Sequence, residues 1–199
     1  GGWSGVSVWE GATVTVGGTA TGAGNRITGF AKGIILDDVV PAPHAAIVGN
    51  RIWGNTYLAI DLLDNDTTAN DANDADNGPN DLLNFPVISG VKVAGTTATV
   101  AFSLDVPAGS YHIEAFTNPS GADGSGYGEA QITAGSTTIT KTGTGSQSFS
   151  MAYTGAVGDV VALTATQLAS GNPYQTSELS LTATAVNRLG ARLVGIRTT

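Results

Sequence analysis

The most restrictive feature of this sequence is a run of aspartates from Asp61 to Asp81. The run holds seven of the 16 acidic residues of the chain and no basic residue. Carboxylates this close together repel one another, so the segment either stays solvated and disordered or folds around a cation. Apolar residues flank the run at positions 59–63 and 82–86. These anchors favour a folded loop.

Asp, Asn and Gly form tight turns that direct oxygen atoms inward, and calcium takes roughly six to eight oxygen ligands. We therefore predict a calcium site within residues 61–81, in preference to a solvated loop without an ion. The candidate ligands are Asp64, Asp66, Asn70, Asp71, Asp74, Asp76 and Asn80. The loop is not an EF-hand, because no glutamate closes it and no helical pattern flanks it.

Composition narrows the class of protein. Only 12% of the residues are charged and 28 are glycines, which indicates an all-β chain rich in turns. The absence of cysteine excludes disulfides, zinc–thiolate sites and thiol catalysis, and leaves metal ions to staple a secreted protein. The net charge of −8 argues against nucleic acid and against an anionic membrane surface as partners. No apolar stretch reaches the length of about 18 residues expected of a membrane span.

The first third of the chain contains an internal repeat. Residues 25–29 (NRITG) recur as residues 50–54 (NRIWG), and Ile35 recurs as Ile60, all at a spacing of 25. A fixed period in the twenties indicates a solenoid. The repeated units are short apolar runs separated by Gly and Asn, which is typical of the rungs of a parallel β-helix. A degenerate third rung is predicted from Val6, Val8, Val14 and Val16.

From residue 86 onward, apolar and polar residues alternate in segments separated by turn residues. Seven strands are predicted, at 87–93, 97–104, 111–115, 131–140, 149–153, 161–165 and 179–183. This spacing is typical of an immunoglobulin-like sandwich, although the Cys…Trp…Cys signature of antibody domains is absent. Four apolar linker residues are expected to pack between the two parts: Leu82, Leu83, Phe85 and Pro86.

The order of these motifs resembles a module of large bacterial secreted surface proteins with right-handed parallel β-helix repeats, often of the CSLREA-domain type. The resemblance rests on GNRIWGN at 49–55, IDL at 60–62, the aspartate run, LNFP at 83–86, YHIEAFTN at 111–118 and SGYGE at 125–129. Ala59 and Ala122 depart from that pattern. The resemblance implies a short right-handed parallel β-helix (1–84) that closes with the calcium loop (61–81) and passes into an Ig-like antiparallel sandwich (85–186). It also implies an extracellular structural or adhesive role at the bacterial cell surface.

An enzyme is the less favoured hypothesis. Parallel β-helices include polysaccharide lyases, but Arg26 and Arg51 align by the repeat and are expected on the rung surface. His44 and His112 fall in different parts, and His112 is expected to be exposed. The alternative kept open is a polysaccharide-binding or polysaccharide-cleaving module, in which Trp3, Trp9, Trp53 and the loop 121–128 form a glycan surface.

The last segment, residues 187–199, is both apolar and basic on an otherwise acidic chain. Its candidate assembly residues are Arg192, Leu193, Val194, Ile196 and Arg197. Such a segment suits self-association, by adding a strand to a neighbouring subunit and pairing with its aspartates, or it is the start of a linker to a neighbouring module. The expected function is therefore an extracellular, calcium-stabilised structural module, adhesive or filament-forming, without catalytic activity.

Overall fold

The computed structural model describes residues 2–188. This part of the chain is all-β, and its one helical element is the short 3-10 segment η1 (Pro79–Leu82). Across residues 2–188 no helix has the length and apolar character needed to cross a membrane. The five predicted assembly residues lie outside the described residues: Arg192, Leu193, Val194, Ile196 and Arg197.

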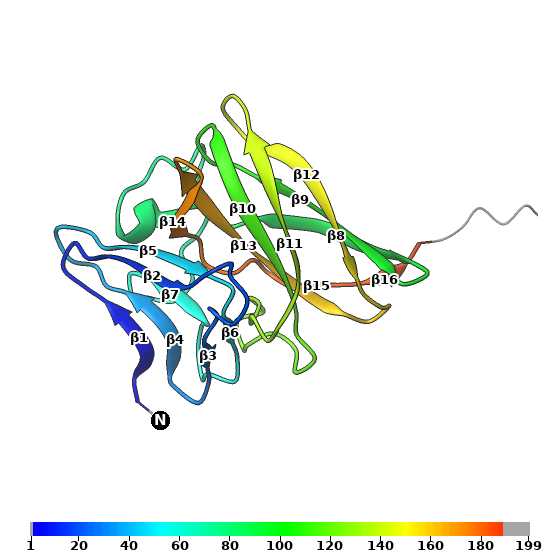
Figure 1. Ribbon diagram of the computed structural model, residues 1–199, viewed down its shortest axis with the longest axis horizontal. Coiled ribbons are helices and arrows are strands. Elements are labelled where there is room, and N and C mark those ends of the chain that lie inside the picture. The colour runs from blue at the N-terminus through cyan, green and yellow to red at the C-terminus, as the bar shows by residue number, and fades with distance from the viewer. Residues whose placement is uncertain (1, 189–199) are drawn as a thin grey trace, which may run out of the picture.

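The chain up to Leu62 forms three small parallel sheets (Figure 1). The first sheet has the order β1-β4-β7 and contains β1 (Ser4–Val8), β4 (Lys32–Leu36) and β7 (Ile60–Leu62). The second pairs β2 (Thr13–Gly17) with β5 (His44–Val48), and the third pairs β3 (Arg26–Ile27) with β6 (Arg51–Ile52). Equivalent strands of successive passes along the chain therefore lie side by side and parallel.

The repeat predicts one of these registers correctly and misses another by one residue. Arg26 pairs with Arg51, as the spacing of 25 predicts. The prediction that Ile35 aligns with Ile60 is wrong, because Ile34 is the partner of Ile60 and Ile35 pairs with Asp61. The step from Ile52 to Ile60 is one residue longer than the step from Ile27 to Ile34, their partners in the preceding pass. The slip keeps Ile34 and Ile60 together in the core of the parallel sheets.

The second part of the chain contains two sheets. One has the order β12-β9-β8-β16 and contains β8 (Val87–Ala94), β9 (Thr97–Leu104), β12 (Gln147–Thr154) and β16 (Val186–Asn187). The other has the order β11-β10-β13-β14 and contains β10 (Gly109–Thr117), β11 (Ile132–Lys141), β13 (Val160–Ala169) and β14 (Asn172–Thr176), with β15 (Ala183–Thr184) also paired to β13. All pairings are antiparallel except that of β16 with β8.

Six of the seven predicted strands are present, whereas the strand predicted at 179–183 is replaced by the two-residue β15. The apolar face of β9, for example, is buried at Ala98, Val100, Phe102 and Leu104. The last strand starts earlier, as β14, which returns from β13 in a hairpin. Leu179 packs into the core of the parallel sheets rather than the sandwich core, and Leu181 is 52% exposed.

The sheet β11-β10-β13-β14 is buried on both faces at its centre. Along β13, Leu163 belongs to the core between the two antiparallel sheets, whereas its neighbour Ala162 belongs to the core of the parallel sheets. Phe116 on β10 joins the same parallel-sheet core. This sheet is therefore the middle layer of three. Polar residues on its second face, such as Thr164 and Thr166, are buried because the parallel sheets cover them.

Side chains from η1 and from the antiparallel sheets bond to the free edge of β5 and to Gly49, which follows it. The outer edge of a sheet carries backbone N–H groups without strand partners, and here alternate groups donate to buried side chains. The bonds run from Ala45 to Asn80 Oδ1 (2.6 Å), from Ile47 to Thr176 Oγ1 (2.8 Å) and from Gly49 to Glu114 Oε1 (3.0 Å). The last pass of the parallel sheets is thus closed by the sandwich rather than left open.

The apolar linker packs as predicted. Leu82 lies against the core of the parallel sheets, and Leu83 is part of the sandwich core. Phe85 is buried and meets the ring of Tyr127 edge to face, with 5.4 Å between the ring centroids. The linker therefore fills the junction between the two parts.

Candidate metal centre

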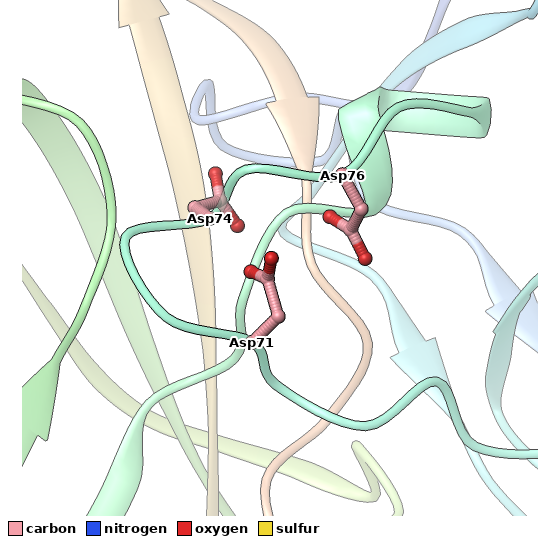
Figure 2. Close-up of side chains that lie close together, drawn as sticks. All are labelled: Asp71, Asp74 and Asp76. Atoms are coloured by element: carbon pink, nitrogen blue, oxygen red, sulfur yellow. The ribbon is translucent and has the colours of Figure 1, made fainter.

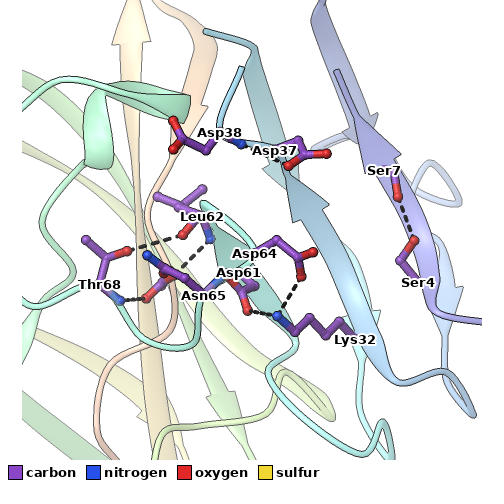
Figure 3. Close-up of polar contacts among 11 residues, drawn as sticks. Ser4, Ser7, Lys32, Asp37, Asp38, Asp61, Leu62, Asp64, Asn65 and Thr68 are labelled. Atoms are coloured by element: carbon purple, nitrogen blue, oxygen red, sulfur yellow. Dashed lines mark hydrogen bonds and ion pairs between the residues drawn. The ribbon is translucent and has the colours of Figure 1, made fainter. Parts of the chain in front are cut away.

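The aspartate run does not act as one cluster, because its beginning pairs with a lysine from an earlier pass of the chain. Lys32 Nζ on β4 lies 2.7 Å from Asp61 Oδ2 and 2.6 Å from Asp64 Oδ1 (Figure 3). Burial lowers the pKa of Lys32, but its bonds to the two carboxylates outweigh that effect and raise the pKa overall. Asp61 and Asp64 therefore share one lysine within the protein.

Three aspartates further along the loop converge on one point. Oxygen atoms of Asp71, Asp74 and Asp76 lie within 4.8 Å of one another. Figure 2 shows the three carboxylates turned toward one another from successive bends of the loop. The described residues contain no other group of three acidic, histidine or cysteine side chains placed this way.

Backbone turns fix the positions of these carboxylates. The Asp71 carboxylate accepts bonds from the N–H of Ala75 at 3.1 and 3.0 Å. Asp74 has a left-handed backbone (φ 56°), which Asp tolerates better than most residues. Asp74 Oδ1 accepts the N–H of Asn84 at 2.6 Å, and Asn84 Oδ1 accepts the N–H of Asp71 at 2.9 Å. Asn84 is buried and joins the two arms of the loop.

The electrostatics of the cluster are unfavourable without a cation. Burial, followed by the charges of Asp76, Asp71 and Asp81, raises the pKa of Asp74 to about 7. Burial and the charge of Asp71 also raise the pKa of Asp76. Asp76 Oδ1 is buried and has no hydrogen-bond partner. Among residues 2–188 the ion pairs involve only Lys32, so no basic side chain compensates these three charges.

A cavity of about 260 Å³ opens beside the cluster and adds possible ligands from the sandwich. It is lined by Asp74, Ala75, Asp76, Asn77, Asp81, Pro107, Gln167 and Gln175. Gln167 and Gln175 are cross-strand partners on β13 and β14. Side-chain amide oxygens are ordinary calcium ligands. The sequence analysis missed both glutamines, because only the pairing of distant strands brings them to the loop.

Four of the predicted ligands are placed away from the cluster. Asp64 binds Lys32, and Asp66 lines a different cleft together with Asp123. Asn70 exchanges two hydrogen bonds with the backbone of Phe85. Asn80 is fully buried, where it accepts the N–H of Ala45 and donates to the carbonyls of Ala45 and Thr176. The structure brings together Asp71, Asp74 and Asp76 and leaves these four in other contacts.

Buried glutamates connect the parallel sheets to the sandwich, and no local sequence pattern marks them. Glu178 is 2% exposed and accepts the N–H groups of Leu62 and Thr68, both at 2.9 Å (Figure 3 shows Leu62 and Thr68). Burial raises the pKa of Glu178 to about 8 and that of Glu114 to about 7. The two carboxyls thus accept hydrogen bonds from backbone N–H groups at the ends of β7 and β5, at Leu62 and Gly49.

The residues considered for other chemistry take surface or structural positions. The guanidinium groups of Arg26 and Arg51 lie over the ring of Trp53, at 4.8 and 4.9 Å from its centroid. Both arginines are exposed on adjacent passes, as the repeat predicts. His112 is half-buried rather than exposed, and burial lowers its pKa. His44 stacks on Tyr174 and contacts Gln175 through Nδ1 at 3.1 Å.

Comparisons of this chain with protein-family models, with curated proteins and with solved structures found no match.

Proposed function

We propose that the protein is an extracellular, non-catalytic structural module that calcium stabilises at Asp71, Asp74 and Asp76. The observation that carries this proposal is the convergence of three carboxylates without a basic partner, one of which has a buried oxygen that accepts no hydrogen bond. Burying such charges is costly unless they are paired or bind a metal. A bound ion removes the repulsion among the carboxylates and satisfies Asp76 Oδ1.

Calcium suits this site better than magnesium does. Calcium accepts irregular arrangements of carboxylate, amide and carbonyl oxygens, whereas magnesium requires a near-octahedral shell and retains its waters. The loop offers ligands from irregular turns, and Gln167 and Gln175 complete an oxygen-rich wall. The alternative to a bound ion is protonation of Asp74, because its pKa of about 7 allows the carboxyl to hold a proton at neutral pH.

For the fold, we propose that the parallel sheets are a short right-handed β-helix and that the sandwich is Ig-like. The parallel registers at 25 and 26 residues support the first assignment. The order β12-β9-β8 facing β11-β10-β13-β14 supports the second assignment. One strand differs from the constant-type Ig order: β11, the fourth strand of the sandwich, pairs with the third strand β10 rather than with the fifth strand β12.

A structural role follows from the closed junction. Thr176 and Glu114 of the sandwich bond to the free edge of β5 and to Gly49, and the sandwich contributes residues to the core of the parallel sheets, so the two parts form one rigid unit. Such a unit suits a surface, adhesive or filament-forming protein of bacteria, of the kind that the sequence resembles. Self-association through residues 187–199 belongs to the same proposal.

The direct test of the site is terbium luminescence, because terbium replaces calcium at oxygen sites and is excited by a nearby tyrosine. Tyr111 lies close enough to Asp74 for the charge of Asp74 to raise its pKa. We expect sensitised emission that calcium displaces and that Asp74→Asn abolishes, while the matched surface variant Asp38→Asn leaves it unchanged. Emission that persists in Asp74→Asn contradicts the assignment.

A further inference from the structure

A second concave site lies apart from the aspartate cluster. It is a cleft of about 440 Å³ between the parallel sheets and the loop that joins β10 to β11. Three short segments line it: Thr56, Tyr57 and Leu58; Asp66 and Thr67; and Asp123, Gly124 and Ser125. Its volume falls within the usual range for small-molecule sites, roughly 300–1,000 Å³.

The lining combines an aromatic ring with hydrogen-bonding groups. Tyr57 is 49% exposed, and Leu58 beside it is buried. Asp66, Asp123, Thr67 and Ser125 add carboxylates and hydroxyls to the walls. None of the ion pairs within residues 2–188 includes Asp66 or Asp123, so the cleft is anionic.

Each wall is held in place without a ligand. The N–H of Tyr57 donates to the carbonyl of Ala31 at 2.8 Å, which fixes the aromatic segment to the preceding pass of the chain. The N–H of Thr68, adjacent to the second segment, donates to the buried Glu178 at 2.9 Å. In the third segment the N–H of Ser125 donates to Asp123 Oδ1 at 2.7 Å. Preorganised walls reduce the ordering cost of binding.

These features select the class of ligand. Carboxylates accept paired hydrogen bonds from neighbouring sugar hydroxyls, and an exposed aromatic ring packs against the C–H face of a sugar. The two aspartates, on a chain with a net charge of −8, repel acidic ligands. A metal ion is disfavoured because the described residues bring three carboxylate oxygens together only at Asp71, Asp74 and Asp76. We propose that this cleft binds a saccharide unit that carries no acidic group.

The site differs from the glycan surface expected from the sequence. The loop 121–128 does take part, through Asp123, Gly124 and Ser125, but the aromatic residue is Tyr57 and none of the three tryptophans lines the cleft. The proposal is independent of the calcium site, since the cleft and the cavity beside Asp74 share no lining residue.

The test is an NMR titration of the full chain, at constant saturating calcium, with individual disaccharides. The panel contains cellobiose, maltose, mannobiose and diacetylchitobiose as neutral ligands, chitobiose as a basic one and digalacturonic acid as an acidic one. We expect at least one neutral or basic disaccharide to cause saturable shifts in the amides of residues 56–58 and 123–125, and digalacturonic acid to cause none.

Four variants make the test specific. Tyr57→Ala and Asp66→Asn are each expected to weaken binding at least about tenfold, a loss of about 1.4 kcal/mol, whereas Tyr57→Phe retains the ring and most of the affinity. Trp9→Ala removes another exposed aromatic ring, which does not line the cleft, and is expected to leave binding unchanged. The proposal is overturned if no disaccharide of the panel shows saturable binding at millimolar concentration. It is equally overturned if binding survives Tyr57→Ala in a protein whose spectrum is otherwise native.

Discussion

Replacing Asn80 with alanine separates a structural role at the junction from the calcium-ligand role that the sequence suggests. Asn80 is fully buried and makes three hydrogen bonds, to the N–H and carbonyl of Ala45 and to the carbonyl of Thr176. Asn80→Ala leaves the Ala45 N–H buried without an acceptor and deprives two carbonyls of a donor. Asn80 also has a left-handed backbone (φ 52°), which alanine adopts less readily.

The magnitude follows from these contacts. An unsatisfied buried N–H costs about 1–3 kcal/mol, and alanine, which tolerates the left-handed region less well than asparagine, adds up to about 1 kcal/mol. Including the weaker loss at the carbonyls, we expect a total of about 3–4 kcal/mol. For a chain of this size that corresponds to a fall in Tm of roughly 6–16 °C, at about 2–4 °C per kcal/mol.

The assay is urea unfolding followed by tryptophan fluorescence, in saturating calcium and again in chelator. Asn80→Ala should lower the free energy of unfolding by the same amount in both conditions, because Asn80 does not contact the ion. Asn80→Asp keeps the acceptor for Ala45 but places a buried carboxylate oxygen against the carbonyls of Ala45 and Thr176, so it should not recover the loss. A loss below about 1 kcal/mol, or one that occurs only in calcium, refutes the structural role.

Three other perturbations test the remaining parts of the structure. Burial raises the pKa of Glu178 to about 8 and that of Glu114 to about 7, so the folded state binds protons more tightly than the unfolded state. In chelator, the free energy of unfolding should therefore fall as pH rises from about 4.5 to 8. Glu178→Gln should flatten that fall in chemical denaturation curves, and an unchanged slope would contradict the burial argument. Lys32→Met leaves the buried Asp61 carboxylate unpaired and should cost about 3–5 kcal/mol, with partial recovery when Asp61→Leu is added; full stability of the single variant would count against the pair. A Cβ on Gly33 would collide with the carbonyl of Ala59 and the side chain of Ile52, so Gly33→Ala should cost about 1–3 kcal/mol in a thermal melt. Gly90 has open space around it, so Gly90→Ala should leave the melting temperature unchanged.

The local alternation of the sequence predicts most of the sandwich strands but not which faces are doubly covered. On β9, apolar and polar residues alternate because one face packs and the other meets solvent. On β13, Ala162, Thr164 and Thr166 stand where a solvent-facing side is expected, yet they are buried by the parallel sheets. The same packing explains why Leu179 leaves the sandwich core. Small and polar side chains give no local sign of a partner layer from elsewhere in the chain.

The cluster of Asp71, Asp74 and Asp76 lies in the loop for which the sequence predicts a metal site, but the surroundings of the loop depend on contacts far apart in sequence. The acidic run contains no base, and Lys32 reaches Asp61 and Asp64 only because β4 pairs with β7. Gln167 and Gln175 reach the cavity through the pairing of β13 with β14. Asn80 has the residue type of a ligand, and its role in closing the edge of β5 appears only once the sandwich is in place.

The most direct test of the central claim is the melting temperature with and without calcium, in the native sequence and in Asp74→Asn. With calcium at about 100 times its Kd, binding should add about 2.7 kcal/mol, or roughly 5–11 °C in Tm, and magnesium should add less. Asp74→Asn should remove this gain, while its Tm in chelator should equal or exceed that of the native sequence, because a repelling charge is gone. Identical melting curves in calcium and chelator for the native sequence would contradict the account.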